Sequence, residues 1–158
     1  MADEGGIAKW HYDVFLCFRG EDTRHTFTGN LYAALRKARL RTFFDVGLKG
    51  GDQIFEAILE ALKASRISIV VFSKNFASSS WCLEELVNIL RCKKTKKQLV
   101  IPIFYNVDPS HVRKQTGSFG KDLDTLERRL GNEIVRKWKS ALFEVASLSG
   151  WCFGDGNR

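Results

Sequence analysis

Two adjacent glutamates, Glu84 and Glu85, stand inside the segment SSSWCLEELVNIL at residues 78–90. A carboxylate can transfer protons or stabilise developing positive charge, so this pair is a candidate for chemistry. The apolar residues around it recur at helical spacing. They predict a helix that begins near Ser80 and whose core-facing stripe consists of Leu83, Leu86, Val87 and Leu90. Both glutamates lie off this stripe.

The two glutamates have different neighbours, because residues four apart stack along one face of a helix. Glu84 shares its face with Ser80 and Asn88, and this polar column predicts a solvated side chain. Glu85 follows Trp81 by four residues, which predicts a partly hydrated carboxylate at a cleft edge or with a perturbed pKa. A simpler interpretation stays open, in which both acids only stabilise the first turns of the helix through its dipole. We expect Glu85 to be the functional residue.

Apolar, β-rich segments alternate with helical patterns along the chain. Strands are predicted at 11–18, 40–44, 67–73 and 99–105, and helices from residue 22, at 53–65, from residue 80, near 118–129 and at 133–148. This alternation predicts an α/β fold with a parallel sheet and helices on both faces. Ligands of such sheets bind beyond the carboxyl ends of the strands. That rule selects the segments 19–24, 45–52, 73–85 and 106–117, the last as a polar loop.

Composition narrows the class of protein. A chain of 158 residues with 44% hydrophobic residues can form one globular core. The ends, 1–9 and 152–158, are predicted to be flexible. No apolar run is long enough to span a membrane, and the N-terminus lacks a secretory signal pattern. Four cysteines without CxxC spacing, and three histidines without triad or metal-ligand spacing, predict no disulfide framework and no metal site.

The formal net charge is +7, and basic residues concentrate in RKARLR (36–41) and RCKKTKK (91–97). Such runs are typical of solvated helix ends, but they also suit nucleic acid or a small anionic ligand. Neither a GxGxxG nor a GxxxxGK[ST] pattern is present. A Rossmann dehydrogenase and a P-loop NTPase are therefore disfavoured.

Four longer motifs appear in order along the chain: YDVFLCFRGEDTR, WCLEELVNI, VIPIFYNVDPSHVRKQTGSF and KWKSALFEVASLSGW. Together they resemble the plant-type TIR domain of TIR-class disease-resistance receptors, from about Tyr12 to Trp151. The resemblance implies a flavodoxin-like three-layer fold with a five-stranded parallel sheet over residues 10–151. The fifth strand, which the pattern does not reveal, is expected after residue 117.

The same resemblance implies a function and a set of site residues. TIR domains of this type self-associate and hydrolyse NAD+ to nicotinamide and linear or cyclic ADP-ribose products, with NAD+ or NADP+ as substrate and no further cofactor. The glutamate of the WCLxEL pattern is catalytic in the family, and here it is Glu85. The substrate-binding residues that the resemblance implies are Arg19, Gly20, Arg24, Lys49, Gly51 and Trp81. For Arg19 and Arg24 an alternative stays open, namely pairing with the nearby Glu21 and Asp22.

Partners and location follow from the resemblance as well. The expected partners are other TIR domains, including a second copy of this chain, and further receptor domains. The expected location is the cytoplasm, with the nucleus as a second compartment. A non-catalytic interaction module is the main alternative to an enzyme, and a nucleic-acid binder is the third. Neither nucleic acid nor a membrane is an expected partner.

The chain departs from the family pattern at several positions. Cys17 replaces a common serine on a predicted buried strand, where we expect no consequence. Gly29 and Asn30 stand where many relatives have Ser-His, which puts one self-association surface in doubt. Fewer charged residues than usual follow the second strand, at Phe44, Val46 and Gly50. These departures bear on the rate and the assembly more than on the type of reaction.

Overall fold

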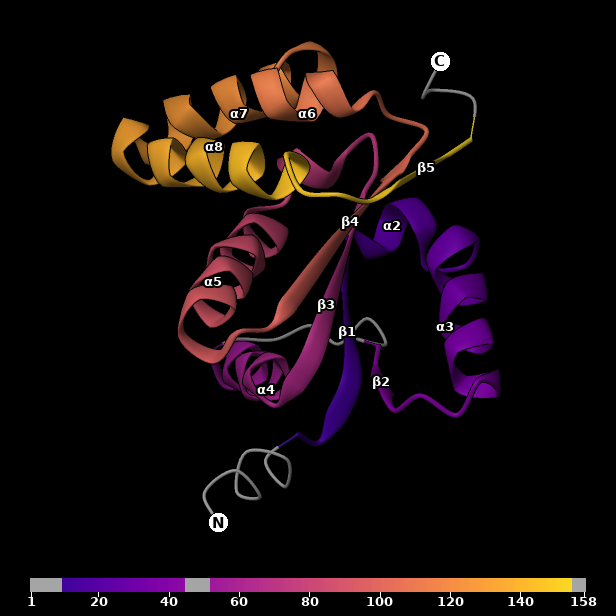
Figure 1. Ribbon diagram of the computed structural model, residues 1–158. Helices are drawn as coiled ribbons and strands as arrows, with labels where there is room; N and C mark the ends of the chain where they lie inside the picture. Colours follow the sequence, from indigo (N-terminus) through magenta and orange to yellow (C-terminus); the bar gives the residue numbers. More distant parts are fainter. Residues whose placement is uncertain (1–9, 45–51, 155–158) are drawn as a thin grey trace.

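The computed structural model describes residues 10–44 and 52–154, with side chains from residue 54 onward in the second range. Its centre is a sheet of five parallel strands in the order β2-β1-β3-β4-β5. The strands are β1 (Tyr12–Phe18), β2 (Thr42–Phe43), β3 (Ser65–Phe72), β4 (Leu99–Tyr105) and β5 (Trp151–Phe153). The predicted α/β class and the five-stranded parallel sheet are confirmed (Figure 1).

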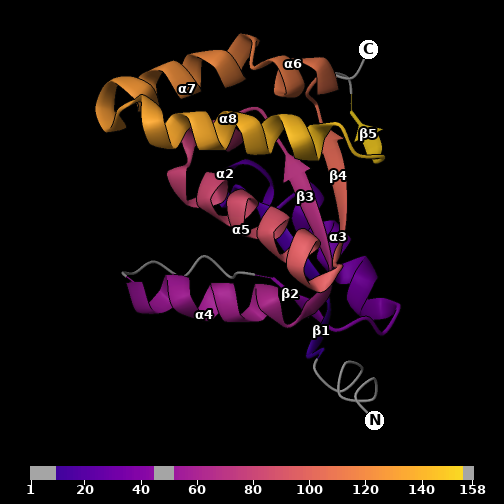
Figure 2. The same cartoon turned by 60° about the vertical axis from the view of Figure 1, so that its left-hand side comes forward.

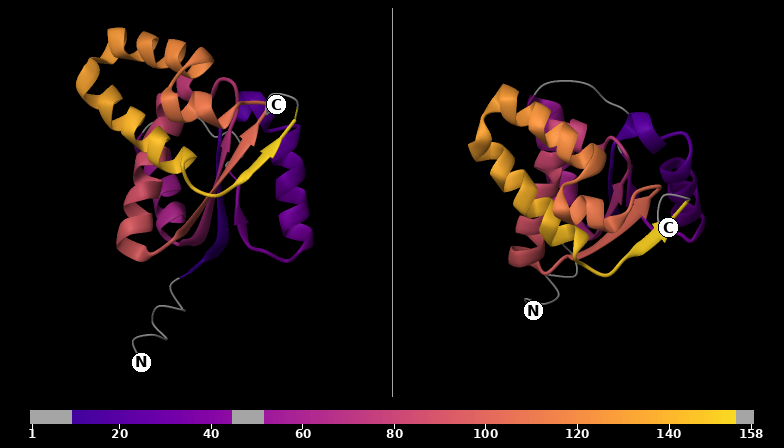
Figure 3. Two further views of the ribbon diagram at one scale, coloured as in Figure 1. Left: turned by 45° about the horizontal axis from the view of Figure 1, so that its top comes forward. Right: turned by 90° about the horizontal axis from the view of Figure 1, so that it is seen from above.

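Helices cover both faces of this sheet. They are α2 (Gly20–Thr23), α3 (Phe27–Lys37), α4 (Asp52–Lys63), α5 (Ser80–Lys96), α6 (Pro109–Lys114), α7 (Gly117–Leu130) and α8 (Asn132–Ala146), with a 3₁₀ turn, η1, at Phe76–Ser78. α3 lies on one side of the sheet, and α4, α5 and α8 lie on the other (Figures 1 and 3). α5 packs against both α4 and α8 (Figure 2). No helix in the described ranges is both long and apolar enough to cross a membrane.

Strand β1 contributes to the core on both of its faces. Phe15 and Cys17 belong to the cluster under α4, α5 and α8, whereas Val14, Leu16 and Phe18 belong to the cluster under α3. Successive side chains of a strand point to opposite faces, so a strand covered on both sides must be apolar throughout. This is why the predicted buried strand could be recognised as a continuous apolar run.

Strand β5 is the element that sequence patterns missed. It is only three residues long, and its side chains are exposed. Its backbone pairs with β4, where Ile103 is opposite Trp151 and Tyr105 is opposite Phe153. Backbone pairing at a sheet edge leaves no hydrophobic period to read. The expectation of a fifth strand after residue 117 is confirmed, and the sheet extends past the expected domain limit at 151 to take in residues 152 and 153.

Two other segments differ from the predicted elements. The segment 106–117, predicted to be a polar loop, contains α6. Asp108 caps this helix, since its Oδ1 accepts the backbone N–H of Ser110 at 2.9 Å, and Pro109 occupies the first turn. The dipeptide Asp108-Pro109, which is typical of turns, thus begins a helix here.

The first predicted helix is divided into α2 and α3. Thr26 interrupts it with a non-helical φ of −127° and ψ of −107°. The buried hydroxyls of Thr23 and Thr28 hydrogen-bond across the break at 2.6 Å. In this structure a side chain at Gly29 would collide with the carbonyl oxygen of Arg24, so a larger residue there would require the backbone between α2 and α3 to shift.

The strand order determines where a ligand can bind. From β1 the chain passes to β2 on one side, while β3 pairs with the other side of β1. The helices that follow β1 and β3 therefore diverge to opposite faces, and a crevice opens at the carboxyl ends of these two strands. The segments after Phe18 and after Phe72 line this switch point.

Candidate functional site

A pocket of about 910 Å³ lies at the carboxyl end of β1. Its walls come from the end of β1, from α2 and from the first turns of α5. Five predicted site residues line it: Arg19, Gly20, Arg24, Trp81 and Glu85. The other two, Lys49 and Gly51, lie outside the described residues. The fold therefore brings together residues that are more than 60 positions apart in the chain.

Glu85 is the buried carboxylate of this pocket, with an exposed fraction of 5%. Its Oε2 accepts the indole N–H of Trp81 at 2.9 Å, one turn earlier on α5. The start of α5 is set by Ser79, whose hydroxyl accepts the backbone N–H of Cys82 at 3.1 Å. Burial of a carboxylate is costly unless polar partners offset it, and such groups concentrate at functional sites. Glu85 thus lies at a cleft, one of the two alternatives predicted for it, but its carboxylate is buried and not partly hydrated.

The ring of Trp81 is itself held from a second helix. Phe55 of α4 meets it edge to face, with ring centroids 4.9 Å apart and an interplanar angle of 84°. Trp81 thus joins α4 to the carboxylate on α5. The sequence predicted Trp81 as a flat contact for a ligand, and the structure adds a second role as a hydrogen-bond donor to Glu85.

Two buried thiols lie beside Glu85. The Sγ of Cys82 is 3.5 Å from the carbonyl oxygen of Phe18, to which it donates. Burial and the nearby charge of Glu85 raise the pKa of Cys82 to about 12. Burial, and then Glu85, also raise the pKa of Cys17 well above its ordinary value. Both thiols are neutral at physiological pH and are poor nucleophiles.

Arg24 lies over two aromatic rings at the edge of the pocket. Its guanidinium carbon is 5.1 Å from the ring centre of Phe18 and 5.8 Å from that of Phe44. Gly20 makes room for it, since a side chain there would occupy the position of the guanidinium. Gly20 thus leaves space for Arg24, and its role as a ligand contact stays a prediction.

Arg19 is paired with acidic neighbours, which was the alternative left open for it. Its guanidinium lies 2.9 Å from Glu21 Oε1 and 3.3 Å from Asp22 Oδ1. Three-quarters of its side chain is buried, at an exposed fraction of 24%. Arg19 is therefore positioned by α2, whereas Arg24 is positioned by the aromatic rings.

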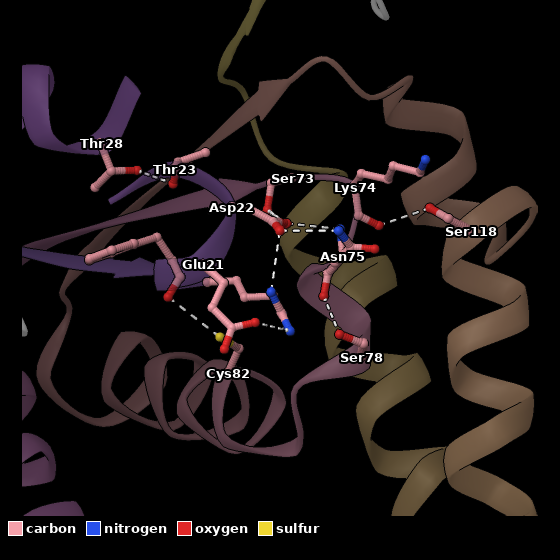
Figure 4. A network of polar contacts seen from close by, with 12 residues as sticks. Glu21, Asp22, Thr23, Thr28, Ser73, Lys74, Asn75, Ser78, Cys82 and Ser118 are labelled. Carbon is pink, nitrogen blue, oxygen red and sulfur yellow. Dashed lines mark hydrogen bonds and ion pairs between the residues drawn. The ribbon is translucent and has the colours of Figure 1, made fainter. Parts of the chain in front are cut away.

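Asp22 connects α2 to the segment that follows β3 (Figure 4). Its Oδ2 accepts the hydroxyl of Ser73 at 2.5 Å and the backbone N–H of Asn75 at 2.9 Å, and its Oδ1 accepts the Asn75 side chain at 3.1 Å. Burial acts to raise the pKa of Asp22, but these hydrogen bonds and Arg19 outweigh burial and lower it. The bonds hold the two rims of the crevice together.

The sequence singled out Asp22 only as an alternative partner of Arg19 or Arg24, and it did not single out Ser73 or Asn75. Their position in the sequence could have pointed to them, because Ser73 ends the predicted strand 67–73 and Asn75 follows it. The end of this strand lies at the edge of the sheet where ligands bind. Which residue they contact could not be read, since Asp22 is 51 positions away from Ser73. The network continues to α7, where the Ser118 hydroxyl donates to the Lys74 carbonyl at 2.9 Å (Figure 4).

A second aspartate, Asp122 of α7, lies behind this network. Its Oδ2 is buried and accepts no hydrogen bond from the residues that the structure describes. Burial raises the pKa of Asp122, while the nearby charge of Arg19 opposes this and that of Asp22 adds to it. Within the described ranges, no group of three His, Cys, Asp or Glu side chains is arranged to hold a metal ion.

The prediction that Glu84 is solvated holds only in part, because the residue is half-buried. Its Oε2 accepts the indole N–H of Trp138 on α8 at 2.9 Å, and Trp138 is almost completely buried. Glu84 therefore contacts the neighbouring helix α8, which the polar column on α5 did not reveal. Glu84 thus has a structural role, and it does not line the pocket.

Comparisons with known proteins agree with the fold and with the motifs. The family model described as TIR domain matches residues 11–157. The disease resistance protein RUN1 of Vitis rotundifolia is 53% identical over 148 residues, which is 92% of this chain and 11% of that protein. The TMV resistance protein N of Nicotiana glutinosa is 48% identical over 155 residues, or 96% of this chain and 14% of that protein. The chain thus spans only a small part of these relatives.

A solved structure is similar along most of the chain. The TIR domains in the activated Roq1 resistosome, which directly recognises the pathogen effector XopQ, superimpose with a TM-score of 0.82 at 48% identity. The match covers 89% of this chain and 87% of that one. The parallel sheet, the motifs and these similarities all lead to the same assignment: the chain belongs to the TIR domain family.

Proposed function

We propose that this chain hydrolyses the nicotinamide–ribose bond of NAD+, releasing nicotinamide and linear or cyclic ADP-ribose products, with NADP+ as a second substrate. The observation that carries the proposal is the buried carboxylate of Glu85 inside a pocket large enough for a nucleotide. The pocket also holds an indole and two arginines, which suit the flat rings and the phosphates of a dinucleotide.

One carboxylate can suffice for this reaction. Most glycoside hydrolases need a second carboxyl group as an acid, because their leaving group departs as an alkoxide-like oxygen. Nicotinamide is already cationic at its ring nitrogen in NAD+ and leaves as a neutral molecule. What remains is to stabilise the positive charge that develops on the ribose, and a fixed carboxylate does this best when water is excluded. Glu85 is such a carboxylate, because Trp81 holds it in place and it is buried from water.

The other site residues take roles that follow from their surroundings. Trp81 offers a ring to the ligand while its N–H orients Glu85. Arg19 and Arg24 both line the pocket and are the candidates for phosphate contacts, Arg19 from its position beside Glu21 and Asp22 and Arg24 from its position over Phe18. Lys49 and Gly51 remain predicted contacts from the segment before α4.

Nicotinamide release by the purified protein tests the assignment. The Glu85→Gln variant keeps the size of the side chain and an oxygen that can accept the Trp81 N–H, but it removes the charge. We expect it to lose nearly all release of nicotinamide. The matched control is Glu84→Gln on the next position of the same helix, which should retain activity. Equal release by the Glu85→Gln variant and the unchanged protein would refute the proposed function.

We also propose that activity depends on self-association, within plant immune signalling in the cytoplasm and the nucleus. The support is the similar Roq1 structure, whose TIR domains belong to an activated resistosome. Nicotinamide release per molecule should then rise steeply with protein concentration, in parallel with the mass measured by light scattering. A specific activity that is constant over the range in which the mass increases would contradict this dependence.

The same similarity favours a second candidate, a module that only recruits other TIR domains. The two candidates differ in one variant. If recruitment alone is the function, Glu85→Gln should assemble and signal like the unchanged chain. If hydrolysis is the function, it should assemble without signalling.

A further inference from the structure

A second hollow, of about 260 Å³, lies at the end of α3 and the start of β2. Three arginines line it, Arg36, Arg39 and Arg41, together with Tyr32 and Thr42. It is formed by the RKARLR segment, which the proposed hydrolysis does not use. All three arginines are exposed to solvent, so a dissolved ligand can reach them.

The usual explanation for basic residues at a helix end is that they complement its free carbonyls. Here the backbone already satisfies two of those carbonyls, those of Leu35 and Arg36. Leu40 donates its N–H to the Leu35 carbonyl at 3.0 Å, and Arg39 donates to the Arg36 carbonyl at 2.9 Å, which together form a Schellman motif. The guanidinium groups are not needed to cap α3.

Arg39 occupies the one position of this motif that usually belongs to glycine. Its φ is +67°, in the left-handed region, where a side chain is strained and glycine is not. A residue retained at a conformational cost suggests a function for its side chain. The side chain in question is a cation that lines the hollow.

The hollow has an excess of positive charge. The segment 27–44 contains four basic residues and no aspartate or glutamate. Asp13 of β1 reaches Arg41, at 3.4 Å from its Nε. Within the described part of the chain, no carboxylate lies within ion-pair distance of Arg36 or Arg39. Two of the three guanidinium groups thus lack a neutralising partner there.

Arg36 is also held in place. Its guanidinium carbon lies 5.8 Å from the ring centre of Tyr32, and Tyr32 in turn stacks on Phe44 at 4.4 Å with an interplanar angle of 13°. An arginine ordered on an aromatic ring loses less freedom when it binds an anion. Guanidinium groups recognise phosphate oxygens through paired N–H donors.

We propose that the hollow between α3 and β2 is a second ligand site, formed by Arg36, Arg39 and Arg41, which binds the phosphate groups of a small polyphosphate-bearing molecule. Its small volume suits one or two phosphate groups and not a whole dinucleotide. It lies at the amino end of β2, whereas the Glu85 pocket lies at the carboxyl end of β1. The proposal is therefore independent of the proposed hydrolysis.

Inorganic pyrophosphate is the probe, and backbone amide NMR shifts report where it binds. Saturable shifts should cluster at residues 36–42. In the Arg36→Gln/Arg39→Gly variant the affinity at these residues should fall at least about tenfold, because two charged hydrogen-bond donors are lost. Shifts near Arg24 would report the other pocket and are counted separately.

The matched control is Arg128→Gln/Arg129→Gln, which removes two exposed arginines from the last turn of another helix, α7. It should change the affinity at residues 36–42 by less than about twofold. Equal weakening by both double variants would show a general effect of net charge and overturn the proposal. Absence of saturation at about 10 mM pyrophosphate would overturn it as well.

Two further experiments separate loss of binding from unfolding, and a small ligand from nucleic acid. Arg39→Gly alone should raise the melting temperature while it weakens binding, because glycine relieves the left-handed strain; weaker binding is then not a result of unfolding. A short DNA duplex is the third probe. Duplex binding that the Arg36→Gln/Arg39→Gly variant weakens, that the Arg128→Gln/Arg129→Gln variant leaves unchanged and that pyrophosphate does not displace would assign the arginines to nucleic acid and overturn the small-ligand site.

Discussion

The indole N–H of Trp138 on α8 donates to the Oε2 of Glu84 on α5 at 2.9 Å. The neighbouring Glu85 accepts an indole N–H from Trp81 at the same distance. Two consecutive glutamates thus form two similar bonds with different consequences, since one joins a pair of helices and the other orients a carboxylate in a pocket. This pairing allows the two positions to be tested against each other.

Glu84→Ala should destabilise the fold by about 1–3 kcal/mol, because it leaves the buried indole N–H of Trp138 without an acceptor. Glu84→Gln keeps an acceptor and should cost less. Urea unfolding measures both. The control is Glu144→Ala, whose exposed pair with Lys94 at 3.7 Å should contribute less than about 1 kcal/mol. If Glu84→Ala is no less stable than the control, the Trp138 bond does not stabilise the packing of α5 and α8.

Trp81→Phe separates the two roles of Trp81 in the proposed reaction. Phenylalanine keeps an aromatic face but cannot donate to Glu85. We expect kcat for nicotinamide release to fall about 10- to 100-fold, with a small change in KM. This factor corresponds to the free energy of one hydrogen bond to a charged group. A role in ligand stacking alone predicts a near-normal kcat. Trp138→Phe is the matched control, since it removes the other indole N–H and should lower stability without this loss of kcat.

Asp22 should make stability depend on pH. Its pKa in the folded protein is lowered from the ordinary value of 3.8, so its contribution is present above that value and is lost as the pH falls through the folded pKa. Asp22→Asn should therefore be less stable than the unchanged chain at pH 7, and the difference should shrink near pH 3. Urea unfolding at the two pH values measures it. The exposed Asp124→Asn serves as the control, and a difference for Asp22→Asn that is independent of pH would argue against the network.

Asp122 should behave in the opposite way. Its pKa is raised by burial, so the charged form is disfavoured in the folded protein. Its contribution to stability is present below the ordinary pKa of 3.8 and is lost as the pH rises through the higher folded pKa. Asp122→Asn should therefore raise the melting temperature at pH 7, as long as Arg19 keeps its bonds to Glu21 and Asp22. A lower melting temperature would mean that the charge of Asp122 stabilises Arg19 more than burial disfavours it.

The sequence by itself determined the class of fold and which of the two glutamates lies beside Trp81 in the pocket. The buried parts of β1 and β3, residues 14–18 and 69–72, are continuous apolar runs because they are covered on both faces, and this local property can be read from a single chain. The column that places Glu85 next to Trp81 follows from helical geometry alone. Residues near each other in sequence were therefore predicted well, as were the long elements.

The tertiary structure alone decided the contacts between distant segments. The role of Glu84 depends on Trp138, which is 54 positions away, and the role of Asp22 depends on Ser73 and Asn75. Strand β5 forms through backbone pairing, which leaves no pattern in its side chains. The arginines at and after the end of α3 look like an ordinary helix end in the sequence, and only the structure shows that backbone N–H groups already bond to the Leu35 and Arg36 carbonyls. The same physical reason explains Glu84, Asp22, β5 and these arginines. Neighbouring residues in the sequence indicate whether a segment forms a helix, a strand or a turn. The partner of that segment depends on which elements the packed core brings together.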